Sequence, residues 1–377
     1  MKKSLLLKAL LMTLALVFVF VLSSCDVELD LFNDGGDDGE EYLDVKDLSS
    51  IDKDLAKKDA STGLAFKEGT DKETGSKYYS VIGMGTCTDT VLILPSEYEG
   101  VPVTRISNNA FKGAAIERVY IPEGFTEIAH HAFADCEALQ SVKLPDSVKT
   151  IGGNAFSGCK SMVTLYIGNG TEKISDEAFA DCSKIEVVYL PESLTTMGSG
   201  VFSGCRALGK VQFFCKNLAE IPASTFEECI TLQQIIFPEG LKVIGADCFR
   251  GCRSIVEMDI PDTVTKVDNR AFFRCTGLKK LIIPVSIEEW GNFVTYFCKD
   301  LAEITYEGTL AQWDAIKCYP KKELTDEEQR VVSPNESLSM YLSICAEKVV
   351  CTDGEVDIKK VMEDNGFKDS ADLNPDA

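Results

Sequence analysis

The sequence predicts a repeat solenoid of about nine coils, wound as a right-handed superhelix with a parallel β-ladder and short helical or 3₁₀ turns. Cysteine recurs every 23 residues from Cys136 to Cys298, with one step of 24. Phenylalanine keeps the same spacing from Phe133 to Phe272, and proline follows it in most units between Pro122 and Pro284. Because a unit of this length cannot bury its own apolar edge, neighbouring units are expected to stack around one shared core.

Each unit contains one strand that ends at the proline position. Segments such as "SVKLP" and "VVYLP" alternate in a way that is typical of a strand with one buried face. Proline ends the strand because it has no amide hydrogen to donate to the ladder. The "AFxxC" segment is expected to form a tight helical or 3₁₀ turn that directs phenylalanine and cysteine inward. Parallel strands of successive coils would then lie about 4.8 Å apart.

The repeat unit resembles the leucine-rich repeat of the BspA-like family of bacterial cell-surface lipoproteins, with which it shares the signature IP…I…AF…C…L. The resemblance covers residues 78–313, which we assign to a leucine-rich-repeat solenoid. At its end, "YEGTLAQWDAI" resembles the degenerate last repeat and short helix of such arrays. The resemblance implies a role in adhesion to host matrix proteins or to other cells.

The N-terminus has the features of an export signal. Lys2 and Lys3 precede a long apolar stretch, and Leu22–Cys25 reads "LSSC", which resembles the lipobox of bacterial lipoproteins. Residues 1–24 are therefore predicted to be a lipoprotein signal peptide, and Cys25 is the predicted lipidation site. The alternative is a transmembrane anchor, since about 18 apolar residues nearly span a bilayer.

The regions that flank the solenoid are polar. Residues 25–77 are predicted to form an acidic flexible tether, because Asp26–Ala60 carries a net charge of about −9 with few large apolar side chains. Residues 314–377 are assigned to a C-terminal cap and tail. Within them, "EKVVCTDGEVDIKK" predicts two strands around a Thr-Asp-Gly turn, and this hairpin is expected to cover the last coil.

The 15 cysteines can be interpreted in two ways. Cysteines of one column in adjacent coils lie within disulfide range, but a cysteine in every coil also suits a small buried hydrophobe. We favour a reduced, shielded thiol column. Only Cys248 and Cys252 approach the spacing of a zinc site, so no metal is predicted. Cys345 and Cys351 could form a local bridge.

The sequence shows no set of residues with recognisable catalytic spacing, so no enzyme activity, catalytic residue or cofactor is predicted. Its two histidines, His130 and His131, are adjacent and are expected to be solvated. The acidic run "NDGGDDGEE" lacks the spacing of a calcium loop and is expected to be a solvated tether. The net charge of −22 would repel nucleic acid and an anionic membrane surface.

The outward side of the strands is the predicted binding face. Residues two and four positions before each proline should point away from the core. Several of these are large, and we predict that they contact a ligand on a concave β-face: Tyr120, Tyr166, Tyr189, Ile236 and Ile282. The alternative is that aromatic and β-branched residues are present only because they pair well across strands.

Together these features predict a lipid-anchored protein of the bacterial cell envelope that is exposed at the surface and binds a protein or glycan. The partner would belong to a host or neighbouring cell, and contact with the membrane would occur through the lipid anchor only. Two alternatives remain open: a passive envelope component, and a non-catalytic specificity module of an envelope enzyme.

Overall fold

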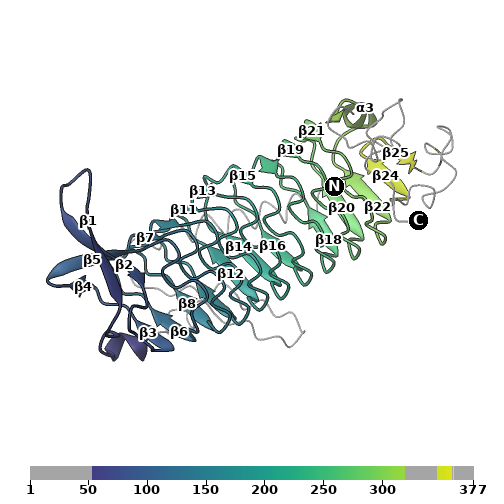
Figure 1. Cartoon of the computed structure of the whole chain (residues 1–377). Helices are drawn as coiled ribbons and strands as arrows, with labels where there is room; N and C mark the ends of the chain where they lie inside the picture. The colour runs from purple at the N-terminus through teal and green to yellow at the C-terminus, as the bar shows by residue number, and fades with distance from the viewer. Residues whose placement is uncertain (1–52, 319–345, 359, 361–377) are drawn as a thin grey trace, which may run out of the picture. The chain divides into compact units, whose positions relative to one another are not determined.

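The computed structural model describes residues 53–318, 346–358 and 360, and over this part of the chain it confirms the predicted fold class. The chain divides into two compact units, Met1–Tyr42 and Leu43–Ala377. The first unit lies outside the described residues, as do the predicted signal peptide and Cys25. The second unit contains a parallel β-solenoid of about ten turns, one more than the sequence predicts (Figure 1).

One parallel ladder, which we call the long ladder, contains the predicted strand of every coil. The chain forms it because the middle residue of each strand is apolar and enters the core, while its two neighbours point outward. Its strands are β3 (Val91–Ile93), β6 (Arg118–Tyr120), β8 (Ser141–Lys143), β10 (Thr164–Tyr166), β12 (Val187–Leu190), β14 (Lys210–Phe213), β16 (Gln234–Ile236), β18 (Glu257–Asp259), β20 (Lys280–Ile283), β22 (Glu303–Tyr306) and β24 (Lys348–Cys351).

A second ladder, the short ladder, lies between each proline and the following turn. Most of its strands have two residues, of which the second is buried, so each coil adds a second apolar side chain to the core. Its strands are β5 (Val101–Ile106), β7 (Glu127–Ile128), β9 (Thr150–Ile151), β11 (Lys173–Ile174), β13 (Thr196–Met197), β15 (Glu220–Ile221), β17 (Val243–Ile244), β19 (Lys266–Val267), β21 (Glu289–Trp290) and β23 (Lys317–Cys318).

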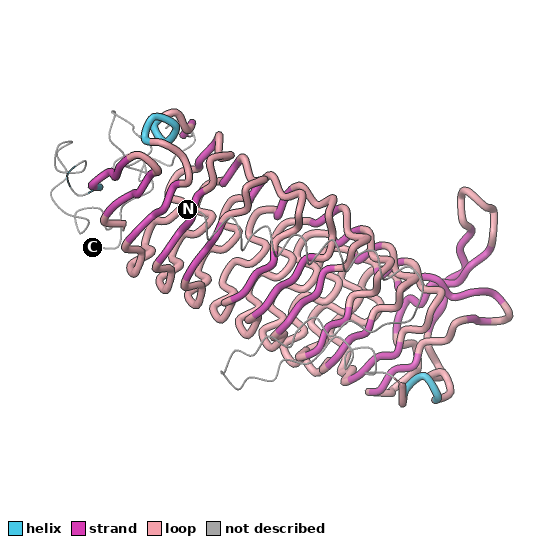
Figure 2. Tube along the Cα trace, turned by 180° about the vertical axis from the view of Figure 1, so that it is seen from behind, coloured by secondary structure: helices cyan, strands magenta, loops and turns pink. Residues whose placement is uncertain are grey.

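The "AFxxC" segments form the predicted tight turns, with hydrogen bonds between residues three apart, but no continuous helix. In one coil the amides of Ala134 and Cys136 donate to carbonyls three residues earlier, both at 3.2 Å. However, His131 and Asp135 adopt the left-handed region, with φ of 55° and 60°. A left-handed residue at every fourth position interrupts a helix before it completes a turn. Figure 2 accordingly shows loops and strands over the whole array, with helix only near its two ends.

The core contains two parallel columns, one of rings and one of thiols. Buried phenylalanines stack from coil to coil with ring centroids 5.0–5.9 Å apart: Phe111, Phe133, Phe156, Phe179, Phe202, Phe226, Phe249 and Phe272. Each cysteine thiol donates to the carbonyl oxygen of the phenylalanine one coil earlier, for example Cys205 to Phe179 at 3.2 Å. A residue that is small, apolar and able to donate a hydrogen bond suits this position, which explains why cysteine recurs there.

The folded array begins earlier than predicted. Strand β1 (Ala65–Thr70) pairs antiparallel with β2 (Lys77–Gly83), which in turn pairs with β5, so residues 65–77 are not part of a tether. The 3₁₀ helix η1 (Leu55–Lys57) buries Leu55, and just before it Asp54 accepts two hydrogen bonds from Arg118, both at 3.1 Å. Residues 25–52 lie outside the described residues.

A second hairpin projects near β1 and β2 at this end of the array (Figure 1). It is formed by β4 (Glu97–Tyr98) and β5, which pair antiparallel across a turn at Glu99 and Gly100.

The other end of the array is closed as the sequence predicts. The short helix α3 (Leu310–Asp314) begins at Thr309, which forms a capping box with Gln312. Strand β24 continues the long ladder next to β22, and β25 (Gly354–Asp357) folds back antiparallel along it. Among the described residues, no helix is long and apolar enough to cross a bilayer.

Candidate binding face

The outward side chains of the long ladder lie on one side of the solenoid, which we call the outer strand face. Tyr120, Tyr166, Tyr189 and Ile282 are half-buried on it, and Ile236 is 46% exposed. The structure therefore brings all five predicted residues onto the same face, on β6, β10, β12, β16 and β20. This placement follows from the period of two along each strand and the parallel register between coils.

Tyr166 and Tyr189 lie on successive coils but have different contacts. The ring of Tyr166 lies 5.8 Å from the Lys143 ammonium, and Asn169 donates a hydrogen bond to its hydroxyl at 3.4 Å. Burial raises the pKa of the Tyr166 hydroxyl above its ordinary value, so it remains a neutral donor at physiological pH. Tyr189 stacks on Phe214 with ring centroids 6.2 Å apart. These contacts hold both rings in place on the surface.

Charged side chains of the outer strand face pair across neighbouring strands. Lys280 on β20 donates to Glu257 on β18 at 2.7 Å, and Lys348 on β24 lies 3.5 Å from Glu303 on β22. These groups are largely exposed, so each pair contributes little to stability. The pairing reduces the local charge density of a strongly acidic chain.

The long ladder is interrupted in two places. Its strands fall into three separately hydrogen-bonded sheets, with breaks between β10 and β12 and between β16 and β18. At the second break, no ladder hydrogen bond joins β16 to β18. The short ladder is continuous there, because β17 pairs with both β15 and β19. The coils are therefore separated only on the side of the outer strand face.

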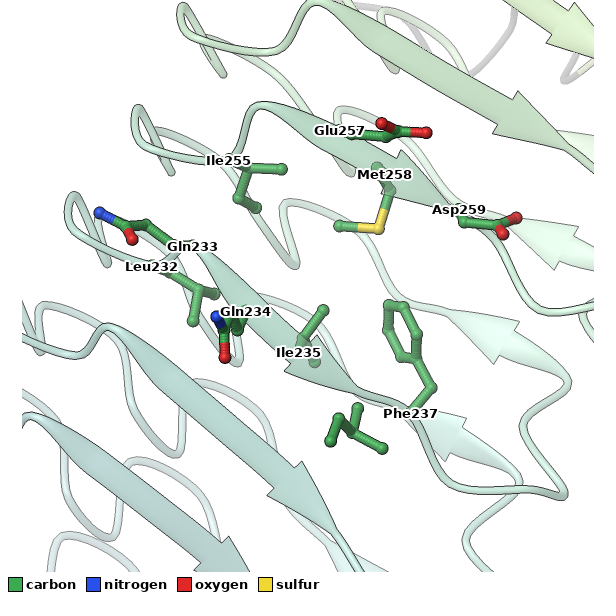
Figure 3. A pocket seen from close by; sticks show the side chains of 10 residues that line it. Leu232, Gln233, Gln234, Ile235, Phe237, Ile255, Glu257, Met258 and Asp259 are labelled. Carbon is green, nitrogen blue, oxygen red and sulfur yellow. The ribbon is translucent and has the colours of Figure 1, made fainter. Parts of the chain in front are cut away.

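A cleft of about 370 Å³ occupies the break between β16 and β18. Figure 3 shows Ile235, Phe237 and Met258 in the space between the two strands, with Glu257 and Asp259 along β18. Ile235 and Phe237 occupy inward positions that are buried in every other coil from β6 to β22, yet here both are only partly buried. The break thus uncovers part of the core.

The prediction of reduced, buried cysteines agrees with the structure. The described cysteines that are free and buried are Cys87, Cys136, Cys159, Cys182, Cys205, Cys215, Cys229, Cys248, Cys252, Cys275, Cys298 and Cys351. Burial raises the pKa of Cys136 to about 12 and that of Cys215 to about 11. Such thiols remain protonated at neutral pH and are poor nucleophiles and metal ligands. The proposed partner of Cys351, Cys345, lies outside the described residues.

Neither histidine shares a site with other metal-ligating groups. His130 is exposed, and its Nδ1 accepts a hydrogen bond from the Gly153 amide at 3.1 Å. Over the described ranges, no group of three or more His, Cys, Asp or Glu side chains is arranged to hold a metal ion.

Comparison with protein families identifies the repeat. The BspA type leucine rich repeat region matches residues 104–232 and 219–319 in six copies, which together span more than half of the chain. The chain belongs to this family. No curated protein matches the chain significantly.

Several solved bacterial structures are similar to this BspA-type chain at low sequence identity. A leucine-rich repeat protein from Bacteroides ovatus is 20% identical, with 67% of this chain and 97% of that chain covered and a TM-score of 0.32. A leucine rich cell surface protein from Faecalibacterium prausnitzii is 18% identical, with 69% and 97% covered and a TM-score of 0.30. The pneumococcal vaccine antigen PcpA is 18% identical, with 83% and 96% covered and a TM-score of 0.36.

Sequence reasoning identified Ile236 but missed the cleft beside it. The spacing of 23 residues is unchanged between Gln234 and Glu257, so periodicity gives no indication of the break. Phe237 stands where most coils have isoleucine or leucine, but Phe213 and Tyr306 occupy the same position in coils whose strands stay paired with the next. The residue type at this position therefore does not predict the break.

Proposed function

We propose that this protein is held at the bacterial cell envelope by a lipid on Cys25 and binds a protein or glycan of a host or neighbouring cell through its outer strand face. The observation that carries the proposal is the row of large, partly exposed side chains along parallel strands. Large aromatic anchors surrounded by less exposed neighbours are typical of interaction hot spots. Membership of the BspA-type family supports the same role, because repeats of this type occur in bacterial surface proteins.

Tyr166 and Tyr189 are the residues through which the proposal is tested. We expect the double change Tyr166→Ser and Tyr189→Ser to reduce attachment of the purified, labelled chain to host cells or neighbouring bacteria by about tenfold. The reason is that both rings are already fixed by neighbouring contacts, so they bind with little loss of side-chain freedom. Attachment is measured by flow cytometry at increasing concentrations of the chain.

Tyr98→Ser is the matched control, since Tyr98 is also partly exposed but lies on β4, away from the outer strand face. It should leave attachment within about twofold. If the double variant attaches as well as the original chain, the outer strand face is not the binding surface. If the original chain attaches to neither cell type, a passive envelope role is favoured.

The predicted anchor is tested separately. We expect Cys25→Ser to release the chain from the membrane fraction, because the lipid needed for stable anchoring is attached to that thiol. The same chemical change at another cysteine, Cys87→Ser, should leave the chain in the membrane fraction. Both variants are followed by immunoblot after cell fractionation, and protease treatment of intact cells shows whether the original chain is displayed outside. Retention of the Cys25 variant in the membrane with its signal uncut would indicate a transmembrane anchor instead.

A further inference from the structure

We propose that the cleft between β16 and β18 binds an extended polypeptide segment that carries a large apolar side chain flanked by lysine or arginine. The inference rests on the proposed function, which it deepens by naming the class of partner. It follows from three independent features of the cleft: uncovered core side chains, unpaired strand edges and carboxylates on one side.

The floor of the cleft is apolar. Ile235 and Phe237 belong to the core, and the ring of Phe237 meets that of Phe249 in the phenylalanine stack edge to face at 6.2 Å. Ile236, which also lines the cleft, is 46% exposed. Partly uncovered apolar side chains of this kind mark sites where another apolar group binds. A partner side chain in the cleft would restore the burial that Ile235 and Phe237 lack.

The edges of the cleft are strands with unused hydrogen-bonding groups. In neighbouring coils the residue before the strand donates to the coil before it, as Gln233 does to Gly209 at 3.0 Å and Lys279 does to Val256 at 2.8 Å. Within residues 53–318, no backbone hydrogen bond joins the Val256 amide to the Gln233 carbonyl. Open strand edges of this kind are used to bind extended polypeptides, whose main chain supplies the missing partners. A glycan has no regular series of amides to do so.

The charge of the cleft selects the partner's composition. Glu257 and Asp259 line one side, whereas Gln233 and Gln234 on the other side are uncharged. The Lys280 ammonium that pairs with Glu257 lies on the next strand, β20. The residues that line the cleft include two carboxylates and no lysine or arginine, and the net charge of −22 would draw a basic segment toward the chain.

The test uses the full chain and a fluorescein-labelled peptide of about nine residues that alternates threonine and lysine around one central phenylalanine. We expect saturable binding by fluorescence anisotropy. It should be lost when the peptide's phenylalanine is replaced by serine or its lysines by glutamate. Hydrogen exchange of the Val256 amide should be fast in the free chain and slow in the complex, because the peptide supplies its acceptor.

Two matched variants locate the site. Ile236→Lys should weaken peptide binding by at least about tenfold, whereas Ile82→Lys should change it by less than about twofold. Both replace an exposed isoleucine, 46% and 42% exposed, by a cation, but Ile82 lies on β2, which pairs with β1 and β5. Thermal unfolding of each variant confirms that it is folded.

Equal effects of the two variants, or binding that does not need the central phenylalanine, would overturn the inference. An oligosaccharide that competes with the peptide for the cleft would also overturn the inference. A dimer in light scattering that only Ile236→Lys disrupts, without peptide binding, would assign the cleft to a second copy and also overturn it.

Failure of this inference can be distinguished from failure of the proposed function. Cell attachment without peptide binding removes only the cleft proposal, and peptide binding without attachment removes only the proposed function.

Discussion

The free energy of unfolding is expected to fall steeply between pH 9 and pH 11. The reason lies in eight buried thiols whose pKa values are raised above the ordinary value of 9.0: Cys136, Cys159, Cys182, Cys205, Cys229, Cys252, Cys275 and Cys298. Burial is the main cause at seven of them. For Cys159 the hydrogen bond with the Cys182 thiol is the larger cause.

The direction of the effect follows from proton binding. Above pH 9 the thiols of the unfolded chain ionise, whereas those of the folded chain stay protonated, so unfolding releases protons and is favoured by rising pH. The stabilisation is complete below pH 9 and is lost as pH rises toward the folded values, which reach about 12 for Cys136. Each thiol lowers the free energy of unfolding by up to about 1.4 kcal/mol per pH unit. Eight thiols together lower the free energy of unfolding by up to about 11 kcal/mol per pH unit, which is comparable to the whole stability of a typical domain, about 5–15 kcal/mol.

Urea unfolding under a reductant at pH 8.5, 9.5 and 10.5 measures this dependence. Replacing Cys182 and Cys205 by alanine should reduce the slope by up to about 2.8 kcal/mol per pH unit, whatever its effect on stability at neutral pH. A control change of the exposed Val163 to alanine should leave the slope unchanged. A free energy of unfolding that does not vary over this range would contradict the buried, reduced thiol column.

Phe179→Ala is expected to lower the free energy of unfolding by about 3–5 kcal/mol. Phe179 is fully buried, and its ring stacks on Phe156 at 5.4 Å and on Phe202 at 5.6 Å. Removing it leaves a cavity that cannot close, because hydrogen bonds between coils fix the distance between the neighbouring turns, such as Phe179 N–H to Val201 at 2.9 Å. Denaturant unfolding followed by circular dichroism measures the loss.

The position of Phe179 in the middle of the array adds a second readout. Each coil contacts mainly its two neighbours, so a weakened central coil should separate the transition into two steps. Phe111→Ala, at the first ring of the stack, should keep a single transition because little of the array lies before it. A loss below about 1 kcal/mol for Phe179→Ala would show that the coils do not depend on the stack.

The sequence by itself determined the architecture and which side chains of each strand face solvent. A period of 23 residues fixes which side chains meet from coil to coil, so the placement of Phe179, Cys205, Tyr166 and Tyr189 could be predicted without coordinates. The closing hairpin could be predicted as well, because turn chemistry is local. These features depend on residue type and spacing alone.

Only the tertiary structure decided where the array begins and where its ladder opens. The polar residues 65–77 fold because β1 and β2 pair through the backbone with each other and with β5, which composition does not reveal. The break between β16 and β18 leaves no mark on the spacing of 23 residues. Whether neighbouring strands pair depends on how the side chains of several coils pack together, and no repeat pattern records that packing.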